Sequence, residues 1–184
     1  MNPLIVILII VVVLALLAVG IYNGLIRKRN QVENAWAQID VQLKRRLDLI
    51  PNLVETVKGY ASHERETLEA VVEARNKALA APSTPAAQAG ADGQLTGALR
   101  GLFALSEAYP DLKAYTNFLQ FQEELTATEG RVSYARQFYN DTVLGYNNKL
   151  DSFPSVIFAR ILNFTRREYF EAEDSARQAP NVKF

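Results

Sequence analysis

The residues of this chain that could carry chemistry are few, and the most suggestive motif is incomplete. The segment His63–Thr67, HERET, begins like the helix of a zinc protease, in which two histidines four residues apart bind the metal. Thr67 stands where the second histidine is required, and His63 is the only histidine of the sequence. A multi-histidine metal site is therefore excluded within one chain, and we interpret His63 as a helix-surface residue.

Carboxylates offer a second possible site. Asp40, Asp48 and Glu55 recur every seven or eight residues, so they share one side of a predicted helix. Di-metal sites in helical bundles need Glu-x-x-His pairs, which a single histidine cannot supply. The sequence also contains no Ser-His-Asp set, phosphate-binding loop or nucleotide fingerprint. No catalytic, cofactor-binding or metal-binding residue is therefore predicted.

The composition narrows the function classes further. The 184 residues include 20 Lys+Arg and 20 Asp+Glu, so no net positive charge is available to recruit nucleic acid. The absence of cysteine removes disulfides, thiol catalysis and cysteine zinc sites. With 49% hydrophobic residues the chain can bury a core.

An apolar run without any charged residue extends from Leu4 to Ile21. At about 1.5 Å per helical residue it spans roughly 27 Å, close to the thickness of the hydrocarbon core of a bilayer. We therefore predict that residues 1–26 are a transmembrane anchor. The alternative is a signal peptide cleaved near Ala18-Val19-Gly20, but Met1-Asn2-Pro3 carries no Lys or Arg and the run exceeds a normal signal-peptide core.

The residues after this run predict the membrane interface and the topology. Tyr22 stands where interfacial aromatic residues occur, and Arg27, Lys28 and Arg29 follow it. We predict that these four residues lie at the membrane interface. The positive-inside rule then places the rest of the chain in the cytoplasm, with the anchor in a bacterial plasma (inner) membrane; a periplasmic domain is the alternative.

Apolar residues recur every three or four positions from Val32 onward, in the heptad-like phase of a coiled-coil packing face. Pro51 falls inside this pattern, yet Leu47 and Val54 on its two sides keep the same phase. We predict a kinked helix that continues through Pro51. The alternative is a new helix capped by Asp48, with Pro51 in its first turn.

The segment 80–93, AAPSTPAAQAGADG, is rich in Pro, Gly and Ser and predicts a flexible loop. Amphipathic patterns from Leu95 to Tyr109 and over residues 111–150 predict two more helices. Because short connections make neighbouring helices antiparallel, residues 27–150 are predicted to form an antiparallel bundle with the loop at its tip.

Folding the chain back at that loop places Lys44 near Glu129 and Trp36 near Gln137. The basic run 44–46 then lies on the order of 30 Å beyond the bilayer edge along a helix, where headgroup charge is screened. We therefore expect this run to contact protein, and we hypothesise that buried charge pairs set the register of the bundle.

Residues 151–184 are predicted to form a C-terminal amphipathic helix and tail. Ile157 and Ile161 lie on its apolar face, and Arg166 and Arg167 lie beside that face. Because the preceding helix would end at the membrane, we predict that these four residues also lie at the membrane interface. The alternative is that the segment packs on the base of the bundle.

The helix predicted over 111–150 carries aromatic residues over a wider arc than one packing seam requires. We predict an interaction surface of a homo-oligomer at Phe118, Phe121, Tyr134 and Phe138. The alternative is that the C-terminal segment folds back and covers these residues.

Several stretches resemble the LemA family of bacterial proteins. They are NAWAQIDVQLKRRLDLIPNLVETVKGYASHE, LFALSEAYPDLKAYTNFLQFQEELTATEGRVSYARQFYND, SFPS and REYFEAE, and the similarity covers nearly the whole chain. The resemblance implies a single-span membrane protein with a helical-bundle domain, and relatives among magnetosome proteins suggest membrane organisation. It supplies no catalytic residue.

The sequence thus predicts an all-α protein whose N-terminal transmembrane helix continues into an antiparallel long-helix bundle of the four-helix type. We expect a non-catalytic, membrane-anchored scaffold without a cofactor, whose partners are the lipid bilayer, copies of itself and an unidentified protein, and not nucleic acid. The alternative is an enzyme or transport component that uses carboxylates and tyrosines in a bundle cleft.

Overall fold

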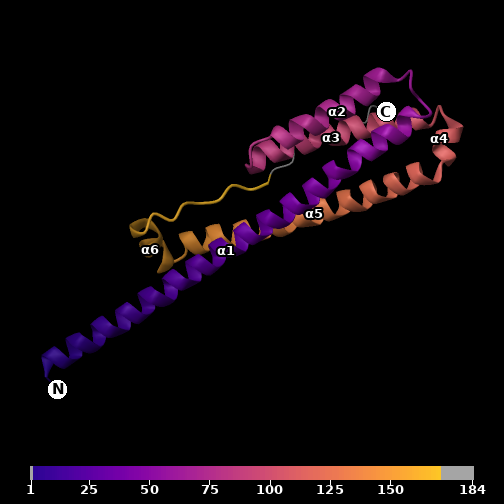
Figure 1. The fold of residues 1–184 in the computed structure, drawn as a ribbon. Coiled ribbons are helices and arrows are strands. Elements are labelled where there is room, and N and C mark those ends of the chain that lie inside the picture. Colours follow the sequence, from indigo (N-terminus) through magenta and orange to yellow (C-terminus); the bar gives the residue numbers. More distant parts are fainter. Residues whose placement is uncertain (1, 171–184) are drawn as a thin grey trace, which may run out of the picture. The chain divides into compact units, whose positions relative to one another are not determined.

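The computed structural model describes residues 2–170, which form six helices (Figure 1). These are α1 (Pro3–Lys58), α2 (Arg65–Ala80), α3 (Pro85–Ser106), α4 (Pro110–Ala114), α5 (Thr116–Asp151) and α6 (Ser155–Ile161). Between residues 2 and 170 no strand is present. The predicted all-α fold is confirmed.

The chain divides into two compact units. Within the described residues, unit 1 consists of residues 2–37 and 137–169, and unit 2 consists of residues 38–136 together with Phe170. Helices α1 and α5 each contribute one part to unit 1 and another to unit 2.

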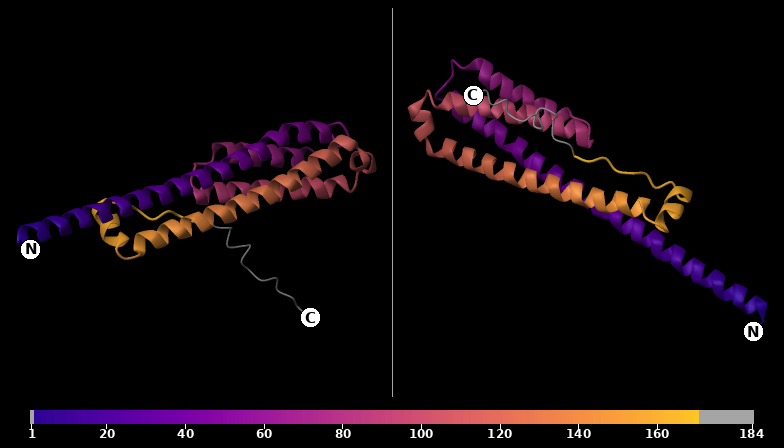
Figure 2. Two further views of the ribbon diagram at one scale, coloured as in Figure 1. Left: turned by 90° about the horizontal axis from the view of Figure 1, so that it is seen from below. Right: turned by 180° about the vertical axis from the view of Figure 1, so that it is seen from behind.

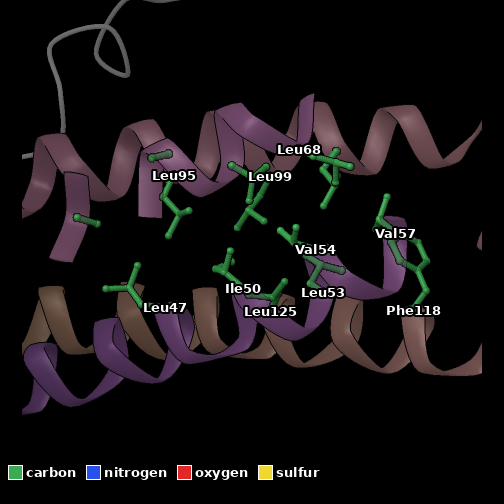
Figure 3. Close-up of a cluster of buried hydrophobic side chains, with 14 of the residues drawn as sticks. Leu47, Ile50, Leu53, Val54, Val57, Leu68, Leu95, Leu99, Phe118 and Leu125 are labelled. Atoms are coloured by element: carbon green, nitrogen blue, oxygen red, sulfur yellow. The ribbon is translucent and has the colours of Figure 1, made fainter. Parts of the chain in front are cut away.

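Unit 2 has a hydrophobic core to which four long helices contribute (Figure 3). Along each helix the buried residues follow one another at steps of three or four, as expected for one face of a helix. The largest contributions are Leu47, Ile50, Leu53, Val54 and Val57 from α1, Leu68 and Val71 from α2, Leu95, Leu99 and Leu102 from α3, and Phe118 and Leu125 from α5. Each fully buried large side chain stabilises the fold by about 1.5–3 kcal/mol.

Helix α1 continues through Pro51, so the prediction of a continuous helix is confirmed against the alternative of a new helix. Proline has no backbone N–H, and therefore the carbonyl of Leu47, four residues earlier, loses its intrahelical partner. Arg75 of α2 replaces that partner, because its Nε donates a hydrogen bond of 3.1 Å to the Leu47 carbonyl oxygen. A side chain from a neighbouring helix thus compensates for the proline.

The predicted flexible loop over 80–93 is wrong. Helix α2 ends at Ala80, residues 81–84 form a short connection, and α3 begins at Pro85. Thr84 is the N-cap of α3, and its side-chain oxygen accepts a hydrogen bond of 3.4 Å from the backbone N–H of Ala87. Thr followed by Pro is therefore a helix start, and the alanines that follow are the strongest helix formers.

The antiparallel pairing of α1 with α5 is nevertheless close to the prediction. In unit 1, Trp36 packs against Tyr139, with ring centroids 5.4 Å apart. In unit 2, Arg46 pairs with Glu129. Both pairs are displaced by two residues from the predicted register. The pairing survives the error in the loop because α2 (16 residues) and α3 (22 residues), which stand between α1 and α5 in chain order, form a hairpin that returns the chain to the end of α1 before α5 begins (Figure 1).

The amphipathic helix expected after Pro154 is shorter than predicted. Helix α6 ends at Ile161, and residues 162–169 continue without helical structure (Figure 2). Asn163 adopts a left-handed conformation with φ of 56°, and the N–H of Phe164 donates to the Ala159 carbonyl at 2.9 Å. This is the Schellman arrangement that terminates helices, in which asparagine can replace glycine. Residues 171–184 of the predicted tail lie outside the described residues.

The contact between Arg75 and the Leu47 carbonyl can be tested by a double-mutant cycle. We expect Arg75→Met to lower the free energy of unfolding by about 1–3 kcal/mol, because a partly buried carbonyl loses its donor. In a Pro51→Ala background the cost should largely disappear, since the alanine introduced there has a backbone N–H that can bind the same carbonyl. Urea unfolding of the detergent-solubilised protein, followed by circular dichroism, measures all four variants. Arg65→Met, which replaces an exposed arginine of the same helix, is the control. If Arg75→Met lowered the free energy of unfolding equally in the wild type and in Pro51→Ala, the proposed compensation for the proline would be wrong.

Candidate functional site

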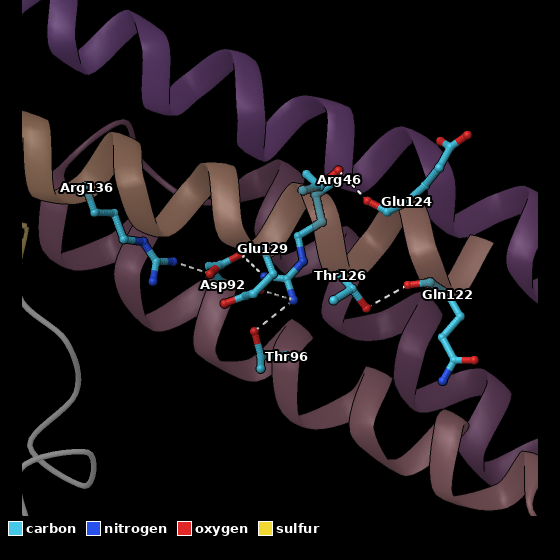
Figure 4. Close-up of polar contacts among 9 residues, drawn as sticks. Arg46, Asp92, Thr96, Gln122, Glu124, Thr126, Glu129 and Arg136 are labelled. Carbon is cyan, nitrogen blue, oxygen red and sulfur yellow. Dashed lines mark hydrogen bonds and ion pairs between the residues drawn. The ribbon is translucent and has the colours of Figure 1, made fainter. Parts of the chain in front are cut away.

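A buried polar cluster connects three helices of unit 2 (Figure 4). Arg46 of α1 is only 3% exposed. Its Nη1 donates to Asp92 Oδ1 of α3 at 2.7 Å, and its Nη2 donates to Thr96 Oγ1 at 3.0 Å. The same Nη2 lies 2.7 Å from Glu129 Oε2 of α5. One guanidinium group therefore fixes α1, α3 and α5 to one another.

A second arginine completes this cluster. Arg136 of α5 donates to the other oxygen of Asp92, and its guanidinium carbon lies 4.7 Å from the centre of the Phe170 ring. Two guanidinium groups thus face two carboxylates, so the cluster carries no net charge. Both oxygens of the buried Asp92 are occupied by arginine. This arrangement stabilises one register of α1, α3 and α5 and gives each Asp92 oxygen a guanidinium partner.

The predicted pair of Lys44 with Glu129 is wrong, because Arg46 occupies that place and Lys44 is exposed. The sequence holds the signal for this correction. Arg46 lies three residues after the buried Leu43 and four before the buried Ile50, so it belongs to the packing face, whereas Lys44 does not.

The other residues singled out for chemistry are exposed. His63 lies in the connection between α1 and α2 rather than on a helix, and Asp40, Asp48 and Glu55 face solvent. Glu55 forms an ion pair with Lys58 at 2.9 Å. Within residues 2–170 no group of three or more His, Asp and Glu side chains is placed to hold a metal ion.

In unit 1, an extended segment of residues 162–169, here called the strap, is bound to α5 by side chains. The Tyr146 hydroxyl donates to the Thr165 carbonyl at 3.1 Å, and the Tyr139 hydroxyl donates to the Glu168 carbonyl at 2.9 Å. The Asn147 amide group donates to the carbonyl of Arg167 and accepts from its N–H, both at 3.0 Å. Thr165 is bound by Tyr146, whereas Glu168 is bound by Tyr139, two turns earlier in α5, so the strap and α5 run antiparallel.

The strap also brings together several residues predicted for the membrane interface. Arg167 pairs with Glu33 of α1 at 3.2 Å, and Arg166 pairs with Asp151 at 2.9 Å. Phe164 packs against Tyr22 with ring centroids 6.2 Å apart.

Arg29 is held in the same place by two contacts. It lies 5.8 Å from the Phe164 ring and 3.9 Å from the Glu33 carboxylate. Of the predicted interfacial residues, Tyr22, Arg29 and Arg167 therefore meet on one part of unit 1, whereas Arg27 and Lys28 line a different cleft.

Helix α6 presents apolar side chains to the outside. Ile157 and Ile161, both predicted for the interface, are exposed, Ile161 by 69%. Phe153, in the turn before α6, is 81% exposed and was not predicted. Its place in a Phe-Pro turn beside an amphipathic segment is the only signal that the sequence offers.

The predicted aromatic surface on α5 is partly wrong. Phe118 is 1% exposed and packs against Phe103 in the core of unit 2, with ring centroids 6.1 Å apart. Phe121 is half-buried against the same core. Tyr134 and Phe138 remain at the surface, with exposures of 72% and 40%. Periodicity alone could not show that α2 and α3 supply a second packing face for α5.

Helix α1 is the only helix among residues 2–170 that is long and apolar enough to cross a membrane, by length and composition. None of its most apolar window is buried against the rest of the protein. An uncovered apolar surface of this length is typical of contact with lipid.

Comparison with known proteins finds relatives along most of the chain. The sequence model of the LemA family matches residues 35–184. Protein LemA of Metamycoplasma hominis is 29% identical over 162 residues, which cover 86% of this chain and 73% of that protein. The magnetosome protein MamQ 2 of Paramagnetospirillum magneticum is 24% identical over 186 residues, covering 88% of this chain and 68% of that protein. The magnetosome protein MamQ of Magnetospirillum gryphiswaldense is 25% identical with the same coverage.

The tyrosine hydroxyls that bind the strap lead us to expect that the stability of the fold decreases at alkaline pH. Burial raises the pKa of Tyr139 and of Tyr146 above the usual value of 10.0. The folded state favours the neutral tyrosine hydroxyl, which donates the hydrogen bond to the strap. The stability that the two hydroxyls contribute to the fold is therefore fully present below pH 10.0, and it is lost as the pH rises through their higher pKa values in the folded state.

We expect Tyr139→Phe and Tyr146→Phe each to lower the free energy of unfolding at pH 8 by about 0.5–1.5 kcal/mol and to weaken its decline above pH 10. Urea unfolding over a pH series measures both effects, with the exposed Tyr134→Phe as control. If the two variants followed the wild-type pH dependence, the hydroxyl bonds would not hold the strap.

Proposed function

This chain belongs to the LemA family, and from that premise we propose that it is a non-catalytic, membrane-anchored helical scaffold. It acts through oligomerisation or the binding of a protein partner, in the organisation of a membrane. The observation that carries the proposal is the surface of unit 1, where α6 exposes apolar side chains and the arginines beside the strap form ion pairs.

The exposed apolar face of α6 supports attachment to the membrane surface. Phe164, immediately after α6, contacts Tyr22 at the end of the apolar part of α1. Within unit 1 this contact holds α6 at the level where an interfacial tyrosine lies. In the proposal, Phe153, Ile157 and Ile161 enter the headgroup region as an in-plane anchor beside the transmembrane helix.

The polar cluster of unit 2 supports a structural rather than a catalytic role. An enzyme or transport component would need a carboxylate or a tyrosine available in a cleft. The buried carboxylate Asp92 is taken up by Arg46 and Arg136, and the buried hydroxyls of Tyr139 and Tyr146 bind backbone carbonyls of the strap. The similarity to relatives named as magnetosome proteins supports the proposed role in membrane organisation.

We propose that the anchor lies in the bacterial inner membrane with the helical domain in the cytoplasm. Three cations, Arg27, Lys28 and Arg29, follow the apolar run, and no Lys or Arg precedes it. The positive-inside rule favours this orientation over a periplasmic domain.

Self-association is tested by measuring the mass of the full-length protein in nanodiscs and in detergent at micromolar concentration. We expect more than one copy per particle, and a loss of association with Tyr134→Ser, because this exposed aromatic ring is a typical interface residue. Val41→Ser, at another exposed apolar position, should leave the mass unchanged. The proposed scaffold function would be contradicted if the protein were a monomer in these measurements and also formed no crosslink to another protein in native membranes.

Topology is tested with single cysteines, since the chain has none of its own. Ser83→Cys, in the exposed connection between α2 and α3, should resist an impermeant maleimide in intact cells and react after permeabilisation. Asn2→Cys, on the other side of the apolar run, should react in intact cells. The reverse pattern would place the domain in the periplasm.

A further inference from the structure

One cleft of unit 1 is apolar at one end and basic at the other. It has a volume of about 600 Å³ and is lined by one face of α1 and by Lys149 of α5. Leu17 and Ile21 line its apolar end, and Arg27 and Lys28 line its basic end. Along α1, Leu17, Ile21, Gly24 and Lys28 follow one another at steps of four, three and four, and Arg27 follows Gly24 by three, so these lining residues share one side of the helix.

The cations of this cleft differ from the arginines beside the strap. Arg29, Arg166 and Arg167 each form an ion pair with a carboxylate of the same unit. By contrast, no carboxylate within residues 2–170 pairs with any of the three cations in the cleft, which are Arg27, Lys28 and Lys149.

Lys149 is brought to α1 by the packing of α5. The Nζ of Lys28 lies 3.6 Å from where a side chain on Gly145 would begin, so Lys28 extends over α5 at that turn. Lys149 follows Gly145 by four residues and therefore lies one turn further along the same face of α5. Two helices thus direct their amines at one cleft, where three like charges repel unless an anion lies among them.

The apolar end of the cleft decides which anion fits. Leu17 and Ile21 belong to the apolar run, which lies in the hydrocarbon region if α1 spans the bilayer. Arg27 follows Leu17 by ten residues, about 15 Å along the helix. A ligand that fills the cleft is therefore anionic at one end and apolar along the remainder. Basic pockets beside membrane helices bind the headgroups of acidic lipids in this way.

We propose that this cleft is a binding site for an anionic phospholipid. Arg27, Lys28 and Lys149 contact the phosphate group, and an acyl chain lies along Leu17, Gly20 and Ile21. Arg27 and Lys28 alone would be the basic residues that commonly follow a membrane helix. Lys149, more than a hundred residues away from the anchor in sequence, adds a third cation from α5 and so defines a specific site. The inference rests on the proposed membrane anchor and adds a lipid selectivity to it.

The test uses the full-length protein in nanodiscs of phosphatidylcholine with one fifth phosphatidylglycerol, and native mass spectrometry counts the lipids that remain bound. We expect the wild type to retain phosphatidylglycerol in preference to phosphatidylcholine. Lys149→Gln should lower that preference about fivefold, as for one cation near an acidic surface. Lys44→Gln removes the same charge from an exposed position of α1 outside the cleft and should leave the preference unchanged.

A second variant changes the shape of the cleft without changing its charge. Gly24 lines the cleft, and a side chain built there meets no atom within 4 Å. Gly24→Leu should therefore be accommodated, remain in the membrane and lower phosphatidylglycerol retention several-fold by occupying the cleft. Equal losses in Lys149→Gln and Lys44→Gln, or full retention in Gly24→Leu, would overturn the site.

Two further arms separate the possible causes of a negative result. Millimolar inorganic phosphate should not displace the lipid; displacement would show that the cations bind phosphate alone and would overturn the lipid assignment. A protein that fails to enter nanodiscs contradicts the membrane anchor itself. A protein that enters them without preferring phosphatidylglycerol contradicts this inference and leaves the anchor standing.

Discussion

The burial of a single guanidinium group constrains the whole of unit 2. Moving Arg46 out of water costs several kcal/mol, and only partners on other helices can offset this cost. Asp92 and Thr96 on α3 and Glu129 on α5 are those partners. A slip of any of these helices by one turn would leave a buried charge unpaired, whereas a slip in a purely apolar core would exchange one leucine for another. The cluster therefore specifies register more than it adds stability, as buried ion pairs do in some other helical proteins.

The same need to satisfy polar groups explains the irregular parts of the fold. Where Pro51 removes a donor from α1, Arg75 of α2 supplies one. Where the strap forms neither helix nor sheet, Tyr139, Tyr146 and Asn147 of α5 bind its carbonyls. In each case a side chain from another segment replaces a backbone partner, since an unsatisfied buried carbonyl costs about 1–3 kcal/mol. Local departures from regular structure are thus tolerated only where tertiary packing brings a donor.

Unit 1 separates its charged groups in a way that fits a membrane surface. The arginines beside the strap are neutralised by Glu33 and Asp151, and the neighbouring α6 exposes isoleucine and phenylalanine. The three cations of the cleft, by contrast, pair with no carboxylate of residues 2–170. Neutral charge pairs enter a region of low polarity at lower cost than lone charges, and lone cations favour anionic headgroups. In the proposal, the unit combines an apolar anchor with a local preference for anionic lipid.

The sequence by itself determined the features that depend on local pattern. A charge-free run of 18 residues indicates a membrane span, an unbroken apolar phase across Pro51 predicts a continuous helix, and helix lengths place α1 against α5 within two residues of the observed register. Only the tertiary structure decided which polar residue is buried, where the helix of segment 80–93 packs, and that Phe118 belongs to the core. The path of the strap also depends on the tertiary structure. The side chains that donate hydrogen bonds to residues 162–169 lie on α5, and the periodicity of the strap sequence gives no sign of them. Periodicity reports one face of one helix, whereas burial depends on how many neighbouring helices cover it.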